Sequence, residues 1–503
     1  MHQFLWLLMS MTRKEWLFFG LACCIKLGLA FLIHPSYSGG SAAGGVFAVR
    51  GGDTFSYLDP VENLFRHGIY AQDLSRLETY AGRMPGYGVV YGALRLVWGP
   101  GGAADGVVLL QLVLSLWALY CLGRLAQQAT QRSAAFQWTV LLYAANTFTT
   151  VFDIRLLSES FAISALIIGV HAFCQGQRPA PAGAVLRIGC WLAWMVFLRP
   201  FLAPLLGLLA GWYVLRPLVE AGGRGPGLRQ GLLRGALLLL PFLVADGAWV
   251  ARNWPWYHHL VPLQSNTWAG YKTAPALNEL NEFMGAIGEE HAWWRPDTDM
   301  AWFYKPATDS SPNFRGEAGK IAPPAFTYDS LVLVRRYLGV AQDSTLPPAP
   351  RQVAEARARR ALVAYKQAFQ RTRPMRAFVL VPFKLAYGLL FAHPGDYLFP
   401  APFAQLPPWQ KGLKILVHLW YLALVALGLA GTLLLGWRPN FAALIVKIVP
   451  LYLIGLFCLI IHLVDARYFA IAYPFVLISA VDLLLTVKGA IENRRRAVRL
   501  KRV

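Results

Sequence analysis

The chain has 503 residues, of which 56% are hydrophobic and only 15% charged, and its formal net charge is +21. A charged fraction well below the roughly 25% of soluble domains excludes a soluble multidomain enzyme. The basic residues lie between apolar segments and at the C-terminus. This placement indicates membrane topology and contact with anionic lipid head groups, with no nucleic-acid partner. We therefore predict an all-α polytopic membrane protein.

About ten transmembrane helices are expected, because ten apolar segments approach the ~20 residues that a bilayer requires. Lysine and arginine cluster in alternate connections, so the positive-inside rule puts both termini in the cytoplasm. The run 377–392 contains Lys384 and is bounded by prolines. We predict that it is interfacial or re-entrant, and an eleventh helix is the alternative. The expected spans are 15–34, 105–124, 135–152, 159–175, 184–199, 200–216, 233–251, 412–436, 441–463 and 467–487.

These spans divide the chain into three parts. Residues 1–251 form an N-terminal transmembrane module with a first outer loop (35–104), 252–411 form a large extracytoplasmic loop, and 412–503 form the last helices and a basic cytoplasmic tail. Both outer loops are expected to carry interfacial helices. Aromatic residues crowd the start of the large loop, which indicates a membrane-interface belt, with a groove for sugar or lipid as the alternative. They are Trp254, Trp256, Tyr257, Trp268, Trp293, Trp294, Trp302 and Tyr304.

The later part of the large loop is strongly basic. Residues 351–376 contain eight Lys and Arg against the single Glu355. A solvated helix face explains this composition, and a site for anionic lipid head groups beside the membrane is the alternative.

The first outer loop holds a carboxylate in an unusual setting. Asp53 follows a Gly-Gly pair and precedes apolar residues at helical spacing, as in a helix lying flat on a membrane. Asp59, Pro60 and Glu62 match an N-cap, a proline at N1 and a capping-box Glu, so the regular helix is predicted to begin at Asp59. Asp53 would then lie on the irregular entry to this helix and face a cavity. A turn-capping role for Asp53 is the alternative.

Ionisable residues gather at the predicted outer ends of several spans. Any single one could snorkel to the interface, yet the outer side should be poor in arginine. Carboxylates and arginines around a cavity suit a reaction in which a base activates a hydroxyl and cations hold a leaving phosphate. The set comprises Asp53, Arg83, Asp153, Arg155, Glu159, Arg199, Arg252, Asp465 and Arg467.

The order of short motifs resembles the GT-C glycosyltransferases. The first outer loop reads Asp53-Thr-x-x-Tyr57, then Gly68-x-Tyr70 and Arg83-Met-Pro-Gly-Tyr87. It is most similar to bacterial relatives of protein O-mannosyltransferases and of the lipid A aminoarabinose transferases. The resemblance continues over nearly the whole chain at Leu157-Ser158-Glu159, Leu198-Arg199-Pro200, Trp249-x-x-Arg252-Asn253 and Ala466-Arg467-Tyr468.

This resemblance implies a multi-pass enzyme of the bacterial cytoplasmic (inner) membrane, with its active site on the extracytoplasmic face. It would transfer a sugar from a polyprenyl-phosphate donor, with inversion, to a hydroxyl of a glycolipid, glycan or protein. Asp53 would be the general base, with Glu159 and Asp153 as further carboxylates of the catalytic site. The donor phosphate would be held by Arg83, Arg252, Arg467 and Lys384. Substrate-binding residues would be Tyr57, Tyr87, Arg155, Asn253 and Tyr468.

Two other classes of function stay open at this point. One is an outer-face polymerase or ligase that uses pyrophosphate-linked oligosaccharides, and the other is a lipid or solute transporter. No cofactor is assigned from the sequence. A divalent metal is left open, because no acidic residue immediately precedes Arg83, where some relatives have one.

Overall fold

The computed structural model describes residues 11–38, 46–75, 77–175, 181–220, 227–264, 275–288, 328–343, 345–392, 397–436 and 440–500. Every regular element in these ranges is a helix, and an isolated parallel bridge joins Val49 to Arg155. The chain forms two compact units. Unit 1 comprises Met1–Gly270, Pro394–Leu451 and Ala470–Val503, and unit 2 comprises Tyr271–His393 and Tyr452–Phe469.

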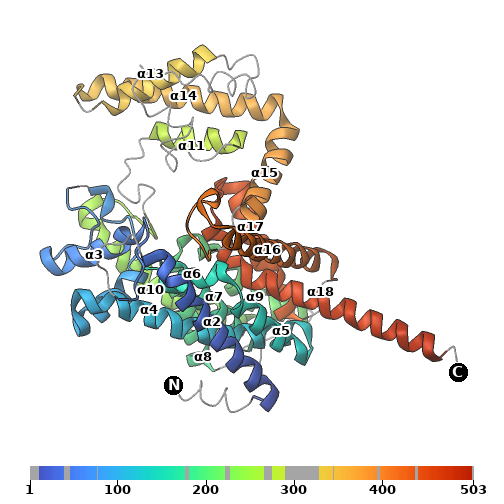
Figure 1. The fold of residues 1–503 in the computed structure, drawn as a ribbon. Coiled ribbons are helices and arrows are strands. Elements are labelled where there is room, and N and C mark those ends of the chain that lie inside the picture. The colour runs from blue at the N-terminus through green and yellow to red at the C-terminus, as the bar shows by residue number, and fades with distance from the viewer. Residues whose placement is uncertain are drawn as a thin grey trace. The chain divides into compact units, whose positions relative to one another are not determined.

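The N-terminal region of unit 1 is a bundle of helices (Figure 1). Helix α4 packs on α5 and α7, α8 packs on α7 and α10, and α2 packs on α5 and α6. These helices are α2 (Arg13–Ser38), α3 (Thr54–His67), α4 (Gly86–Thr130), α5 (Ser133–Ala144), α6 (Thr147–Ile154), α7 (Glu159–Gln175), α8 (Ala182–Leu198), α9 (Ala203–Glu220) and α10 (Gly227–Tyr257), with the 3₁₀ turns η1 (Leu77–Thr79) and η2 (Pro200–Leu202).

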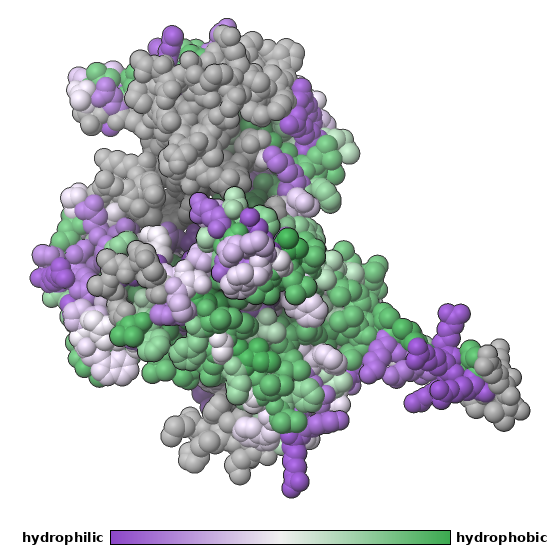
Figure 2. Space-filling model, viewed as in Figure 1, coloured by the Kyte–Doolittle hydropathy of each residue, from purple (hydrophilic) through white to green (hydrophobic). Residues whose placement is uncertain are grey.

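The C-terminal region of the chain contains α16 (Pro408–Leu434), α17 (Phe441–Gly455), the π-helix η7 (Leu456–Ile461) and α18 (Ala466–Leu500), with η6 (Phe403–Gln405) before them. Residues Tyr452–Phe469 of this region belong to unit 2, and the rest belongs to unit 1. Helices α16 and α18 approach so closely that a Cβ at Gly428 would overlap the backbone carbonyl oxygen of Val476, and one at Gly431 that of Ser479. Figure 2 shows apolar residues over much of the bundle and hydrophilic residues along the free end of α18.

The described residues include six helices long and apolar enough to cross a membrane, or seven if one bent pair counts as a single span. Three shorter apolar helices, Glu159–Gln175, Ala182–Leu198 and Pro200–Arg216, match three further expected spans. The chain is therefore a multi-pass membrane protein. The bent pair joins Pro348–Thr372 to Arg376–Phe391 at 100°, so 377–392 stays compatible with both a re-entrant segment and a broken span.

The expected span 135–152 is wrong as a continuous helix. The structure divides it into α5 and α6, and Asn146 lies between them in extended conformation. Its side chain accepts the Thr149 N–H at 3.1 Å and donates to the Tyr473 hydroxyl at 2.7 Å. A polar residue that caps one helix and binds another can interrupt an apolar run. Hydropathy alone did not detect this break.

Helix α4 begins well before the span predicted at 105–124. Its first half ends at Gly99, whose φ of 69° and ψ of 179° interrupt the helix, and Pro100 starts the second half. A positive φ of this kind suits glycine, and proline suits the first turn of the new helix. The predicted first outer loop therefore contains a helical segment directly after Arg83. At its start, a Cβ on Gly86 would lie 2.6 Å from the Phe197 backbone, so glycine permits the contact with α8.

The predicted start of the first-loop helix at Asp59 is also wrong. Helix α3 begins at Thr54 and continues through Pro60 to His67. The Thr54 hydroxyl accepts the Gly51 N–H at 2.8 Å and donates to the Leu156 carbonyl at 3.1 Å, which fixes the first turn. Glu62 makes no capping box, because Tyr91 and Arg95 of α4 bind its carboxylate at 2.7–2.9 Å. Glu62 therefore pairs with Arg95 of another helix and does not cap its own helix.

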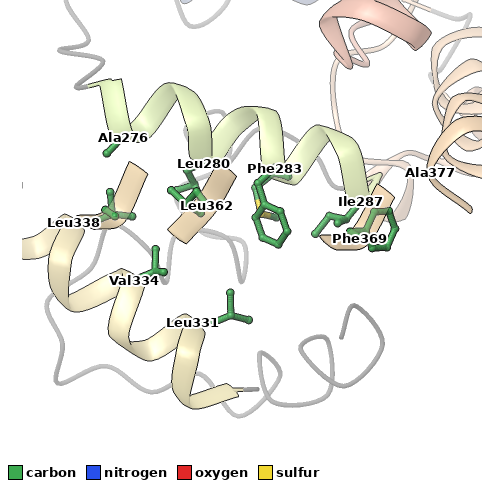
Figure 3. Packing of buried hydrophobic residues seen from close by; sticks show 12 residues of the cluster. Ala276, Leu280, Phe283, Ile287, Leu331, Val334, Leu338, Leu362, Phe369 and Ala377 are labelled. Atoms are coloured by element: carbon green, nitrogen blue, oxygen red, sulfur yellow. The ribbon is translucent and has the colours of Figure 1, made fainter. Parts of the chain in front are cut away.

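Unit 2 has a small hydrophobic core of its own. Helices α11 (Pro275–Ile287) and α13 (Tyr328–Gln342) both pack on α14 (Pro348–Thr372), and Leu280, Phe283, Leu331, Leu362 and Phe369 are among the buried residues that join them (Figure 3). After α14 follow the π-helix η4 (Arg376–Leu380), α15 (Val381–Tyr387) and the π-helix η5 (Gly388–Ala392). Trp268, Trp293, Trp294, Trp302 and Tyr304 of the predicted aromatic belt lie outside the described residues.

The basic stretch of unit 2 is partly neutralised within the unit. Arg359 lies 3.3 Å from Glu279, and Lys366 forms ion pairs with Glu279 and Glu282 of α11. Arg357 and Arg360 are exposed. The choice between a solvated face and an anionic-lipid site stays a prediction.

Candidate active site

The segment that leads to Asp53 is attached to the end of α6. The Val49 N–H donates to the Ile154 carbonyl and the Leu156 N–H donates to the Val49 carbonyl, both at 3.0 Å. Thr54 also bonds to Leu156, so residues before and after Asp53 are both hydrogen-bonded to the segment 154–156. Two parts of the chain that carry predicted site residues, 49–54 and 154–159, are thus held side by side.

Asp53 occupies the N-cap position of α3 but makes no side-chain capping hydrogen bond. Its φ of −86° and ψ of −6° are right-handed helical values, whereas a capping side chain normally requires extended backbone. Its backbone carbonyl, in contrast, accepts both the N–H and the hydroxyl of Ser56, at 3.0 and 2.7 Å. The half-buried carboxylate is therefore not engaged in capping the helix that it precedes.

Arg83 reaches the same turn of α3. Its Nε donates to the Ser56 hydroxyl at 3.0 Å, and its guanidinium carbon lies 4.5 Å from the centre of the Tyr57 ring. Because Ser56 in turn binds the carbonyl of Asp53, a guanidinium and a carboxylate from two sequence regions are attached to one helical turn.

Tyr57 and Tyr87 connect this turn to the bundle. The Ser158 hydroxyl donates to the Tyr57 hydroxyl at 3.0 Å, and the Tyr57 and Tyr87 rings lie 5.2 Å apart. The Tyr87 hydroxyl donates to Gln111 at 3.3 Å. Gln111, which the sequence interpretation missed, donates to the carbonyls of Phe152, Asp153 and Arg155 at 2.9–3.1 Å. The sequence signal for this buried hydrogen-bonding role was a single glutamine inside an apolar run.

Glu159 begins α7 and is completely buried, and its carboxylate forms an ion pair with Arg199 at the end of α8. Arg199 is only 6% exposed. Since Ser158 contacts Tyr57, this buried pair lies directly behind the aromatic residues of the candidate site.

Asp153 lies in a different environment. Its carboxylate is 2.9 Å from Lys26 Nζ and accepts hydroxyl hydrogen bonds from Ser115 at 3.0 Å and Ser160 at 2.6 Å. Lys26 is 1% exposed and also donates to Thr150. Both carboxylate oxygens are occupied inside the bundle, so Asp153 holds helices together at this position. Lys26 was missed, although a lysine in an apolar run suggests a buried partner.

Arg155 and Asn253 have polar atoms that the described residues leave without a partner. The Arg155 guanidinium lies 4.6 Å from the centre of the Tyr37 ring, and its buried Nε has no hydrogen-bond acceptor within the described ranges. Asn253 is fully buried, and its Nδ2 likewise lacks an acceptor there, while its Oδ1 accepts from Arg252 at 2.7 Å.

Arg252 binds the backbone of the first outer loop. Its guanidinium donates to the carbonyls of Tyr70 and Tyr80 and lies 5.1 Å from the centre of the Trp249 ring. Further along α10, the Tyr257 hydroxyl donates to the Leu77 carbonyl at 2.8 Å and accepts the Ala81 N–H at 3.1 Å. The C-terminal end of α10 therefore positions the loop that carries Arg83.

An apolar cavity of about 520 Å³ lies beside this loop, between the start of α4, α8 and α10. Arg252 is the one charged residue among the described residues that line it. The other lining residues include Pro85, Gly86, Trp194, Phe197 and Trp249. The lining is thus apolar with one cationic side chain at its edge.

Three predicted residues belong to unit 2 and are described within that unit alone. Lys384 is exposed and donates to the Gly288 carbonyl at 2.6 Å. Arg467 Nε is 2.9 Å from the Asp465 carboxylate, and the Tyr468 ring stacks on Phe457 with centres 4.5 Å apart.

The part of the chain that the structure describes contains no group of three or more His, Cys, Asp or Glu side chains suited to a metal ion.

On α3, burial raises the pKa of Asp59, with Arg50 opposing the shift. Burial would also raise the pKa of Glu62, but the hydrogen bonds from Arg95 and Tyr91 outweigh it and hold that pKa below its usual value.

No family model and no curated protein matches this chain. Among solved structures, the chain is similar to ArnT from Cupriavidus metallidurans, in a crystal structure of that protein bound to undecaprenyl phosphate. The similarity covers 95% of this chain and 80% of that chain, with 14% sequence identity and a TM-score of 0.36.

Proposed function

We propose that this chain is a membrane glycosyltransferase of the GT-C type, which transfers a sugar from a polyprenyl-phosphate donor to an acceptor hydroxyl. One observation carries the proposal. The carboxylate-bearing turn at Asp53 also binds Arg83, through Ser56 at 3.0 Å and the Tyr57 ring at 4.5 Å. The residue that we assign as base and the cation that we assign to the phosphate are thus attached to one helical turn, which supports the proposal.

The proposed reaction is a single displacement. The acceptor oxygen attacks the anomeric carbon of the donor sugar, the bond from that carbon to the phosphate oxygen breaks, and the configuration inverts. The acceptor proton passes to the Asp53 carboxylate, and polyprenyl phosphate leaves. A carboxylate near a guanidinium stays ionised and able to accept a proton, and a positioned base contributes about 10²–10⁴-fold.

Arg83 is the cation that we assign to the leaving phosphate. Arginine can bind two phosphate oxygens at once, which neutralises charge as the bond breaks. Arg252 borders the apolar cavity of about 520 Å³, which has room for part of an isoprenoid tail. Because its guanidinium already binds loop carbonyls, we assign Arg252 mainly to holding the loop, with its charge adding to the field at the cavity.

The remaining predicted residues have different roles in this proposal. Tyr57, Tyr87 and Arg155 surround the turn, and the Nδ2 of Asn253 is a donor for a bound ligand. Glu159 supports the site through its buried pair with Arg199, and we assign Asp153 a structural role. Lys384, Arg467 and Tyr468 stay candidates for substrate contacts from unit 2. We derive no step through a metal ion.

The site is proposed to face the extracytoplasmic side of a bacterial cytoplasmic membrane, where membrane lipids surround the protein. The acceptor is proposed to be a glycolipid, a glycan or a protein. Mass spectrometry of cell-envelope glycolipids and glycoproteins in a deletion strain would identify both the sugar and the acceptor.

Asp53→Asn tests the proposed mechanism. The amide keeps size and hydrogen bonding but cannot take up the acceptor proton, so sugar transfer should fall by about 10²-fold or more. Thermal stability and donor binding should stay near wild type. Arg83→Ala should instead weaken donor affinity as well as rate.

Asp73→Asn is the matched control, because Asp73 lies in the same loop and its carboxylate accepts the N–H and the hydroxyl of the nearby Ser75. Near-normal turnover of the Asp53→Asn enzyme would refute the mechanism.

A further inference from the structure

A second carboxylate, Asp105, binds the segment that leads to Asp53. It lies in α4, after the break at Gly99. Its Oδ2 accepts the Val46 N–H at 2.8 Å, and its Oδ1 accepts the N–H groups of Phe47 and Ala48 at 2.8 and 2.9 Å. One side chain therefore holds three consecutive backbone amides of the approach to the site.

Two side chains at this end of the anchored segment are exposed among the described residues. Val46 and Phe47 are 76% and 47% exposed. The Phe47 ring contacts Phe31 and His34 of α2, with ring centres 6.1 and 5.8 Å apart. A cavity of about 150 Å³ also lies between these rings and Asp105. Loosely packed backbone of this kind depends on its hydrogen bonds for order.

The anchor is continuous with the site. Directly after Ala48, Val49 bonds to Ile154 and Leu156, and Thr54 bonds to Leu156 through its hydroxyl. The backbone from Val46 to Thr54 is thus fixed at one end by Asp105 and along its length by the 154–156 segment. Asp53 lies within this stretch, so the position of its backbone depends on these hydrogen bonds.

We infer that Asp105 is a positioning residue, which holds the 46–54 segment so that Asp53 faces the reacting groups. This inference rests on the proposed function for its catalytic part. A carboxylate is needed because its two oxygens accept three N–H groups, and charge-assisted bonds of this type are roughly twice as strong as neutral ones. An amide would offer one acceptor and place an NH₂ donor against a backbone donor.

The test compares Asp105→Asn with wild type in the full-length protein in lipid nanodiscs. Hydrogen exchange at the amides of Val46, Phe47 and Ala48 should become about tenfold faster or more, because their acceptor is lost or weakened. The kcat for sugar transfer should fall by about tenfold or more through misplacement of the base, while the donor KM stays unchanged. Asp105→Glu, which keeps both oxygens and the charge, should recover part of kcat.

Asp343→Asn is the control for a carboxylate-to-amide change, because Asp343 accepts the N–H of Thr345 in an exposed turn of unit 2. Unchanged exchange at Val46–Ala48 in Asp105→Asn would overturn the inference, and so would faster exchange with wild-type kcat. If Asp105→Asn fails to fold, Asp105→Glu carries the same two measurements: because its longer side chain shifts the carboxylate, exchange should be faster and kcat lower than in wild type, and wild-type values of both would overturn the inference. If the wild-type chain transfers no sugar, the proposed function fails, and exchange alone decides whether Asp105 anchors the segment.

Discussion

The buried pair between Glu159 and Arg199 gives the sharpest stability test. Glu159 is 0% and Arg199 6% exposed, so removing one charge leaves the other without its partner in a low-dielectric environment. Breaking a buried pair in this way typically costs about 3–5 kcal/mol. Both Glu159→Gln and Arg199→Met should therefore lower the free energy of unfolding by roughly this amount.

The double variant separates the pair from its surroundings. Replacing both charges by neutral side chains of similar length removes the uncompensated ion, so the combined loss should be smaller than the sum of the single losses. The coupling energy expected for residues in contact is roughly 0.5–3 kcal/mol. The assay is denaturant- or heat-induced unfolding of the detergent-solubilised protein, followed for all four members of the cycle. Single losses below about 1 kcal/mol, or strictly additive losses, would refute the reasoning.

The same cycle tests what Glu159 does in the reaction. If Glu159 supports the site only through Arg199, turnover should recover with stability in the double variant. Recovered stability without turnover would mean that the Glu159 carboxylate contacts a substrate or the base.

Three further predictions follow from single contacts or from topology. Tyr257→Phe removes the hydroxyl that binds both Leu77 and Ala81, which should loosen the loop before Arg83 and raise the donor KM in steady-state kinetics. An unchanged KM would argue against a role for α10 in placing this loop. The depressed pKa of Glu62 means that its carboxylate adds stability above the usual value of about 4.3 and loses it as the pH falls through the lower folded value. Glu62→Gln should thus lower the melting temperature at pH 7, by a margin that shrinks in acid, and a margin that grows in acid would contradict the sign. Finally, cysteines at Met300 and Val498 should label from opposite sides of the membrane, and labelling from one side would mean that the spans were miscounted.

The parts of the fold that the sequence could predict are those that depend on local hydropathy. The apolar runs at α7, α8 and α9 produce helices close to their expected bounds, because a bilayer-length apolar segment has few alternatives. The motifs around Asp53 and Arg83 also indicated residues that the fold brings to one turn. Helix α3 and the loop that follows it bring Arg83 back to the first turn of that helix.

The errors have a common physical cause, which is a polar contact between distant residues. The local signals at Asp59 and Glu62 predicted a helix start, but Glu62 is bound by Arg95, and Thr54 begins the helix through its bond to Leu156. In the run 135–152, Asn146 ends one helix because Tyr473 of α18 is its partner. The local sequence pattern of either segment cannot identify a partner that lies elsewhere in the chain. Lys26 was missed for the same reason, because its partner Asp153 lies in a distant helix.

The Lys26–Asp153 pair also has a consequence for biogenesis. Helix α2 carries Lys26 in an otherwise apolar stretch, and a lysine at the centre of a newly inserted helix costs about 2.5–3.5 kcal/mol. Asp153 is synthesised only after α4 and α5, so Lys26 leaves the ribosome before its partner exists. The buried ion pair can form only once α6 has been made, and we therefore expect the docking of α2 into the bundle to follow the synthesis of α6.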